Sequence, residues 1–237
     1  MLKKILNKIK KYRSLQSSSA YISYLRKKRI LIGENCVFRS PKTTRIDITR
    51  PCLITIGDNV DMNMNFQILT HDWASLVFRN VYHELISSSG KVTIGNNIYF
   101  GTNVIVLKGV TIGDNCIIGA GSIVAKDIPA NSVAAGTPAR RIYSLDEYFE
   151  KRKKQHIEEA FEYARAITER YHRLPTVEDF WEEFPLFTDG NQTREHTDRM
   201  IKQLGAKYPL WAKKHKAVFY SFDEFLKAAK IKNDSNS

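Results

Sequence analysis

The sequence predicts a mainly β protein whose central part is a parallel β-helix built from six-residue repeats. Three observations support this fold class. Apolar residues recur at every sixth position, glycines follow the same phase, and a helical pattern begins only beyond residue 141. We therefore expect three parts: a basic N-terminal helical segment over residues 1–29, the β-helix over 30–142, and an α-helical C-terminal extension over 143–237.

Two series of positions carry the repeat. Eleven of their thirteen residues are apolar, and the series are Ile32, Phe38, Thr44, Arg50, Ile56, Met62, Ile68 and Ile94, Phe100, Val106, Ile112, Ile118, Val124. Half of the twelve glycines directly follow a repeat position: Gly33, Gly57, Gly95, Gly101, Gly113 and Gly119. Asp-Asn and Asn-Asn pairs come next, and these residue types tolerate the positive φ of tight corners. Three such repeats, about 18 residues, would close one triangular coil around an apolar core.

The two series are out of register with each other. The step from Ile68 to Ile94 is not a multiple of six, so the chain must leave the coil between them. Residues 72–91 break the pattern, and we expect an extruded loop there. Long ordered loops on a rigid scaffold are usually functional.

The second half of the repeat region resembles the hexapeptide-repeat acyltransferases. The motifs that carry the resemblance are Ile94-Gly95-Asn96-Asn97, Val110-Thr111-Ile112-Gly113-Asp114-Asn115, Ile118-Gly119-Ala120-Gly121-Ser122, Lys126-Asp127-Ile128-Pro129 and Ala134-Ala135-Gly136-Thr137-Pro138-Ala139-Arg140. They are most similar to the branch with galactoside, maltose and xenobiotic acetyltransferases and polysaccharide O-acetyltransferases. The resemblance covers about residues 30–142. It implies a left-handed coil, a homotrimer with active sites between subunits, and acetyl-CoA as co-substrate, with no metal.

His71 is the expected catalytic residue. It stands on the last repeat before the loop, where the related acetyltransferases place their catalytic histidine. Attack of a hydroxyl or amine on a thioester needs a group that accepts a proton near neutral pH, and imidazole is such a group. The alternative is a histidine held by hydrogen bonds at the base of a loop.

Other candidates surround His71 in the sequence. Asp72 alternates with it along a strand and so points to the opposite face, which makes Glu84 or a backbone carbonyl the better orienting group. His83 could line the acceptor site or lie in solvent. Trp73 and Tyr99 offer aromatic faces for a sugar ring, although ordinary packing explains them equally well.

The resemblance also supplies donor contacts. It maps coenzyme A contacts to Thr102, Ala120, Ala125, Lys126 and Arg140, where the two cations would meet phosphates. Ala125 replaces a threonine of the sugar acetyltransferases, and Tyr143 stands where a second arginine is common. No acceptor-binding acid or amide is recognised among residues 40–52, so the acceptor is not inherited from the family.

A helical pattern follows the repeats. Ser144 and Glu147 form a capping box, and an apolar stripe through Ala160, Ala164 and Ile167 predicts a long helix that ends before Pro175. Shorter helices are expected near residues 177–184, 194–204 and 222–230. This extension could pack on the trimer or shape the acceptor site.

The net charge of +12 is concentrated at one end. Residues 1–31 hold ten cations and no acid. Residues 1–13 alternate apolar and cationic positions at helical spacing, which is typical of an interfacial helix as well as of a solvated or packed one. We expect contact with an anionic membrane surface or a nucleotide-like substrate, and no nucleic-acid binding, since no recognition motif is present.

The sequence thus predicts an acetyl-CoA-dependent O-acetyltransferase that acts on a sugar of a bacterial surface polysaccharide or its precursor. The open alternatives are a xenobiotic acetyltransferase, an amino-sugar N-acetyltransferase and a non-catalytic scaffold. A γ-type carbonic anhydrase is disfavoured because only His71 and His83 lie in the coil region. Three scattered cysteines and the lack of an apolar leader or span predict a cytoplasmic protein, peripheral to the inner face of the cell membrane.

Overall fold

The computed structural model describes residues 12–188 and 194–231. The chain divides into two compact units, Met1–Phe149 and Glu150–Ser237. The first contains the β-helix and the second is helical. Most of the interfacial helix expected over residues 1–13 lies outside the described residues. Among the described residues, no helix is both long and apolar enough to cross a membrane.

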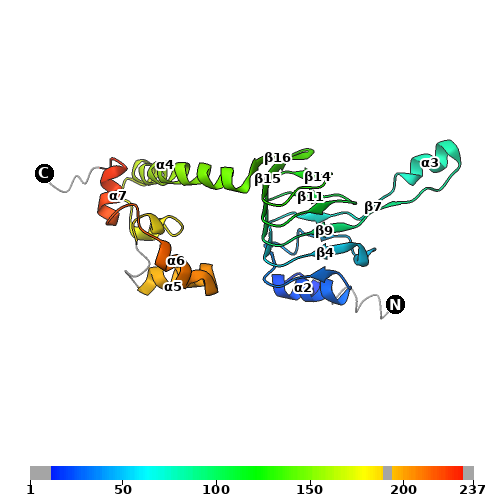
Figure 1. Cartoon of the computed structure of the whole chain (residues 1–237), viewed down its shortest axis with the longest axis horizontal. Coiled ribbons are helices and arrows are strands. Elements are labelled where there is room, and N and C mark those ends of the chain that lie inside the picture. The colour runs from blue at the N-terminus through cyan, green and yellow to red at the C-terminus, as the bar shows by residue number, and fades with distance from the viewer. Residues whose placement is uncertain (1–11, 189–193, 232–237) are drawn as a thin grey trace. The chain divides into compact units, whose positions relative to one another are not determined.

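Three parallel sheets form the walls of the coil (Figure 1). Sheet A contains β1 (Leu31–Ile32), β4 (Ile54–Ile56), β9 (Val92–Ile94) and β12 (Thr111–Ile112). Sheet B contains β2 (Val37–Phe38), β5 (Val60–Met62), β10 (Ile98–Phe100), β13 (Cys116–Ile118), β15 (Ser132–Gly136) and β16 (Ala139–Ser144). Sheet C contains β3 (Arg45–Ile46), β6 (Gln67–Ile68), β11 (Ile105–Val106) and β14 (Ile123–Val124). Each coil passes from A to B to C, so the predicted parallel architecture is confirmed.

The repeat positions of the second series are buried as expected. Phe100, Val106, Ile112, Ile118 and Val124 are fully buried and form one continuous core. Ile98 pairs with Cys116, and Ile105 with Ile123, so one coil advances the chain by 18 residues here. The stack of strands therefore follows the predicted hexapeptide period.

Glycine and asparagine have different structural roles at the corners of the coil. The positive φ falls on the asparagines, among them Asn59, Asn97 and Asn115, rather than on the glycines before them. The glycines are needed for close approach: a Cβ on Gly101 would lie 2.5 Å from the backbone nitrogen of Ala120 in the next coil. Asparagine side chains also stack between coils, with Asn97 Nδ2 donating to Asn115 Oδ1 at 2.9 Å.

The first series is wrong at two positions. The core residue of β3 is Ile46, which pairs with Ile68, whereas Thr44 precedes the strand and Arg50 lies in a connection. Two extra residues before β3 and four after it, including the 3₁₀ turn η1 (Pro51–Leu53), add up to one whole repeat. The phase is thereby restored at Ile56, which explains why the period looked continuous.

The loop expected at 72–91 leaves the coil at the corner between sheets C and A. Its base is an antiparallel pair, β7 (His71–Asp72) with β8 (Ser88–Ser89), and it carries the helix α3 (Ser75–Tyr82). Figure 1 shows α3 standing away from the stacked strands. Trp73, Val81, Tyr82 and Leu85 are largely exposed on this excursion. We call residues 71–91 the excursion from here on.

Both ends of the coil are closed. At the N-terminal end α2 (Ser18–Lys27) buries Tyr21 and Leu25 against the core. At the C-terminal end β16 folds back antiparallel on β15. A helical segment was expected over residues 1–29, but neither its packing on the end of the coil nor β16 was predicted, because the hexapeptide pattern describes only the repeating part.

The second unit is built around α4 (Leu145–Tyr171), whose first residues belong to the first unit. The Ser144 capping box is confirmed, with Glu147 Oε2 accepting from Ser144 N at 2.6 Å. Ala160, Ala164 and Ile167 pack with Phe180 and Phe225 in a separate core. The remaining elements are η2 (Val177–Asp179), η3 (Phe184–Leu186), α5 (Arg194–Leu204), η4 (Gly205–Lys207), α6 (Tyr208–Lys214) and α7 (Phe222–Ala228). Among the described α-helices of this unit, α6 was not anticipated, and the helix expected near 177–184 is present as the two 3₁₀ turns η2 and η3.

Candidate active site

The candidate site lies at the corner where the chain passes from sheet C to sheet A. Two insertions leave the coil at this corner in successive coils: the connection after β3 and the excursion after β6. Ile46 and Ile68 are paired neighbours in sheet C, so the residues that follow them emerge side by side. This stacking brings Asp47 next to Thr70 and His71.

Asp47 is the direct partner of His71. Its Oδ2 lies 2.6 Å from His71 Nδ1 and also accepts the Thr70 hydroxyl at 2.5 Å. Its Oδ1 accepts the hydroxyl and the backbone N–H of Thr49 at 2.6 and 3.0 Å. Only 8% of the Asp47 side chain is exposed, against 25% for His71. The carboxylate is therefore held rigidly, while the imidazole keeps an open edge.

The charge state of Asp47 follows from these contacts. Burial opposes ionisation and is the largest single effect, but the donors from Thr49, Thr70 and His71 together outweigh it. The pKa of Asp47 therefore lies below its usual range. An ionised carboxylate only accepts hydrogen bonds, so Nδ1 of His71 must donate its proton to Asp47. In the neutral imidazole the other nitrogen, Nε2, then carries the lone pair and can act as a base.

The orienting groups considered from the sequence are not the ones found. Asp72 does point away from His71: its Oδ2 pairs with Lys108 Nζ, and its Oδ1 accepts the Ala74 N–H at 3.0 Å. Glu84 is exposed on the excursion, and within residues 12–188 the carboxylate bonded to His71 is that of Asp47. The Lys108–Asp72 pair ties the base of the excursion to the next coil.

The candidate sugar-binding residues are spread over two regions. Trp73 lies near the start of the excursion and is 75% exposed. His83 is the residue directly after α3 and has a left-handed backbone conformation. Tyr99 instead lies in β10 of sheet B, where Asn63 Nδ2 donates to its hydroxyl at 3.3 Å. Within one chain, then, the structure groups Trp73, His83 and Glu84 on the excursion and places Tyr99 on another wall.

The candidate donor residues occupy two corners of the coil. Ala125 and Lys126 follow β14 at the corner of His71, since Leu69 N donates to Val106 O and Leu107 N to Val124 O up the same column. Thr102 and Ala120 lie at the corner between sheets B and C, where Gly121 N donates to Thr102 O at 2.8 Å. Arg140, exposed on β16, pairs with Ala135 beside this second corner. Sheet C separates the two groups.

No cluster of three or more histidine, cysteine, aspartate or glutamate side chains suited to a metal ion occurs in the described parts of the chain. The three cysteines are free thiols, of which Cys36 and Cys116 are buried in the coil.

Comparison with known proteins agrees with this architecture. Residues 91–126 match the family model described as bacterial transferase hexapeptide (six repeats). Protein CapG of Staphylococcus aureus is 43% identical over 124 residues, which span 52% of this chain and 71% of CapG. The chain belongs to the hexapeptide-repeat transferase family.

Other members of the family are similar over the same region. Galactoside O-acetyltransferase of Escherichia coli K12 is 43% identical over 131 residues, 54% of this chain and 59% of that protein. The crystal structure of a maltose O-acetyltransferase from Clostridium difficile 630 is 29% identical, with a TM-score of 0.41 over 58% of this chain and 83% of that one. As a member of this family, the chain is an acyltransferase. The curated matches span about half of its length.

The hexapeptide-repeat pattern does not reveal Asp47. The six-residue count placed Thr44 and Arg50 in the core and so assigned Asp47 to no special position. With Ile46 as the core residue, Asp47 follows it just as Leu69 follows Ile68. Asp47 therefore lies one coil below the base of the excursion. Thr70, which is fully buried and whose hydroxyl bonds to Asp47, was missed because its partner Asp47 was not recognised.

Proposed function

We propose that this chain transfers the acetyl group of acetyl-CoA to a hydroxyl of a sugar in a bacterial surface polysaccharide or its precursor, with His71 as general base. One observation carries the proposal: the 2.6 Å contact between His71 Nδ1 and Asp47 Oδ2 at the base of the excursion. It fixes the imidazole with Nε2 as its free, basic nitrogen.

The chemical step needs only this base. Nε2 of His71 takes the proton of the acceptor hydroxyl while the hydroxyl oxygen forms a bond to the thioester carbonyl carbon. When the tetrahedral intermediate collapses, the carbon–sulfur bond breaks, and the departing thiolate takes the proton back from the imidazolium. The carboxylate of Asp47 stabilises the imidazolium between these two events.

The donor proposal rests on the two groups at the coil corners. Lys126 and Arg140 are exposed cations suited to the phosphates of coenzyme A, and Ala120 and Ala125 are exposed and Thr102 half-buried at these corners. His71 and Arg140 lie at different corners of one chain. A homotrimer with sites between subunits, built on left-handed coils as in the related acetyltransferases, would bring the two corners of neighbouring chains together.

The acceptor proposal rests on the excursion and on the relatives. Trp73 lies two residues after His71 and exposes its aromatic ring. Sugar-binding sites commonly contain an exposed aromatic face of this kind. Galactoside O-acetyltransferase, a relative at 43% identity, is named for acetyl transfer to a sugar oxygen. His83, Glu84 and Tyr99 are further proposed acceptor contacts. Contact of residues 1–13 with an anionic membrane stays a separate prediction.

A thiol-release assay with acetyl-CoA tests the proposal. The acceptor panel contains free sugars, nucleotide sugars, oligosaccharides, amino sugars and chloramphenicol. We expect acceptor-dependent thiol release with a sugar-containing acceptor and an O-acetyl ester as product. Turnover confined to chloramphenicol would show a xenobiotic enzyme, an amide product would show N-acetylation, and no release with any acceptor would favour a scaffold.

A further inference from the structure

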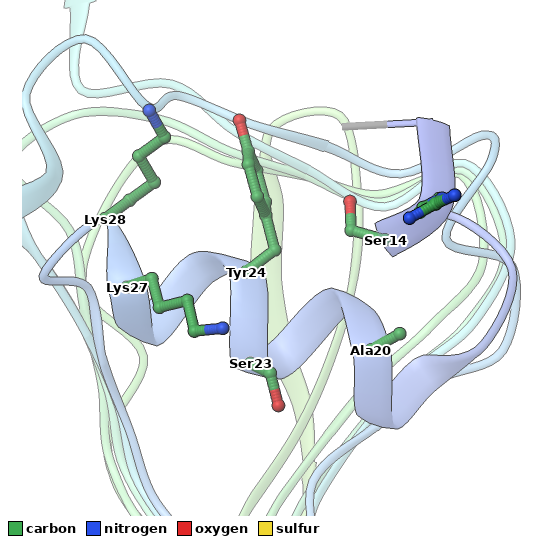
Figure 2. A pocket seen from close by; sticks show the side chains of 7 residues that line it. Ser14, Ala20, Ser23, Tyr24, Lys27 and Lys28 are labelled. Atoms are coloured by element: carbon green, nitrogen blue, oxygen red, sulfur yellow. The ribbon is translucent and has the colours of Figure 1, made fainter. Parts of the chain in front are cut away.

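A basic cavity lies on α2, at the N-terminal end of the coil. Figure 2 shows Lys27 and Lys28 toward one end of this helix, Ser14 toward the other, and Tyr24 between them. The cavity has a volume of about 580 Å³ and is lined by three cations, Arg13, Lys27 and Lys28, and by the hydroxyls of Ser14, Ser23 and Tyr24. No carboxylate lines it among the described residues.

A second cavity shares Tyr24 with the first as a lining residue. It has a volume of about 360 Å³ and adds the cations Lys42 and Arg45 to a lining that includes Thr44 and Tyr21. Ile46 and Ile48, which flank Asp47, also line it. We call the two cavities together the α2 groove. Its lining includes five cations, and like charges near one another repel.

Neighbouring cations are neutralised, whereas those of the groove are not. Arg26 on the same helix pairs with Glu34 at 2.9 Å, and Arg39 pairs with Asp61 at 2.6 Å. For Arg13, Lys27, Lys28, Lys42 and Arg45, no carboxylate lies within ion-pair distance among the side chains described in residues 12–188 and 200–231. The ammonium of Lys28 lies 5.6 Å from the centre of the Tyr24 ring. An anion would relieve this unbalanced charge.

The groove is separate from the proposed donor site. α2 packs beside β1 and β2 in the first coil, whereas Arg140 lies on β16 beyond the last coil, at the opposite end of sheet B. The phosphates of coenzyme A at Lys126 and Arg140 therefore do not account for the groove.

We propose that the α2 groove binds a phosphate or pyrophosphate group. Cations at several angles, with hydroxyl donors between them, provide the charge and the hydrogen bonds that phosphate oxygens accept. Two sources offer this chemistry: the headgroup of an anionic lipid in a bilayer, and a soluble sugar acceptor that carries phosphate. This inference does not depend on acetyl transfer, because it concerns binding without a donor.

The test measures binding of two probes to the full chain at low salt, in the absence of acetyl-CoA. One probe is inorganic pyrophosphate, followed by isothermal titration calorimetry, and the other is phosphatidylcholine vesicles with or without phosphatidylglycerol, followed by co-sedimentation. The variant is Lys27→Ala with Lys28→Ala. The matched control is Lys213→Ala with Lys214→Ala, because these also form an exposed lysine pair in the last turn of a helix, α6.

We expect the groove variant to bind at least one probe about tenfold more weakly, while the control variant binds like the wild type. Loss for vesicles alone identifies a lipid headgroup, and loss for pyrophosphate alone identifies a soluble phosphate. Ser23→Asp, which adds a carboxylate to the groove, should reproduce the loss. Wild-type binding of both probes by the groove variant, or equal weakening in the control, would overturn the proposal.

Discussion

Asp47 accepts hydrogen bonds from three side chains, and this determines which nitrogen of His71 is basic. Asp47→Asn replaces an obligate acceptor by an amide that can donate to Nδ1 and so place the proton on Nε2, the wrong tautomer. We expect kcat to fall by roughly 10²- to 10⁴-fold, with little change in acetyl-CoA affinity. Steady-state kinetics over a pH range measures this.

Asp72→Asn is the matched control for this prediction. Asp72 is adjacent to His71 in sequence but contacts Lys108 instead of the imidazole. Its substitution should leave kcat within about tenfold of the wild type, since the base keeps its partner. A loss in the control as large as that of Asp47→Asn, or wild-type turnover by Asp47→Asn, would show that Asp47 does not position the base.

Two residues of the candidate site show how much of it the sequence alone can predict. His71 was identified from its place before the excursion, and the structure gives it a carboxylate partner. Asp47 could not be found in the same way, because insertions of two and four residues around β3 hid its register behind an apparently continuous period. Contacts between coils depend on such insertions, and a six-residue count does not detect them.

At the scale of elements, the turn after α4 depends on an ion pair between an exposed arginine and a half-buried aspartate. The two terminal guanidinium nitrogens of Arg173 donate to the carboxylate of Asp179, at 2.7 and 2.8 Å. Asp179 also accepts a hydrogen bond from Thr176 N at 2.8 Å. Arg173 is the main cause that lowers the pKa of Asp179 to about 2. A carboxyl whose pKa is lower in the folded state stabilises the fold above its unfolded pKa, about 4, and loses that contribution as pH falls toward 2.

We therefore expect the free energy of unfolding of the helical unit to fall between about pH 4 and pH 2. Asp179→Asn should lower it at pH 6 and reduce its decline below pH 4, because the titrating group is gone. Asp223→Asn, at an exposed position in α7, is the control and should keep the wild-type pH dependence. Urea unfolding at each pH, followed by circular dichroism, gives the comparison. An unchanged acid decline in Asp179→Asn would contradict the assignment.

The elements themselves were largely predictable where a period governs them. The hexapeptide phase gave the second series of strands, and the capping box at Ser144 gave the start of α4. The strand β16 has no period to reveal it, and the helical character expected over residues 1–29 did not show that α2 covers the end of the coil. The helix α3 within the excursion is too short for a clear periodic signal.

At the scale of the whole molecule, the candidate site divides between two corners of the coil. His71 and Lys126 lie at one corner, and Thr102 and Ala120 lie at another with Arg140 beside it. If neighbouring chains of a trimer join these corners, a His71→Ala chain and an Arg140→Ala chain contain complementary defects. Mixed trimers, formed by co-expression with two tags, should then recover thiol release that neither variant shows alone.

The control for mixing is a trimer of His71→Ala with Asp47→Asn, whose defects lie at the same corner and should not complement. Equal recovery in both mixtures, or an active monomer by analytical ultracentrifugation, would refute sites between subunits. The sequence could suggest this assembly only through the resemblance, since a repeat pattern specifies contacts within one coil and not those between chains.

The most direct test of the account is the turnover number of His71→Ala with acetyl-CoA and the best acceptor of the panel. The account predicts a fall in kcat of about 10²- to 10⁴-fold with nearly unchanged acetyl-CoA affinity, as expected for loss of a general base. His172→Asn, an exposed histidine directly after α4, serves as the control and should retain most of its turnover, since no contact with donor or acceptor is proposed for it. Wild-type kcat in His71→Ala would contradict the assignment of the active site.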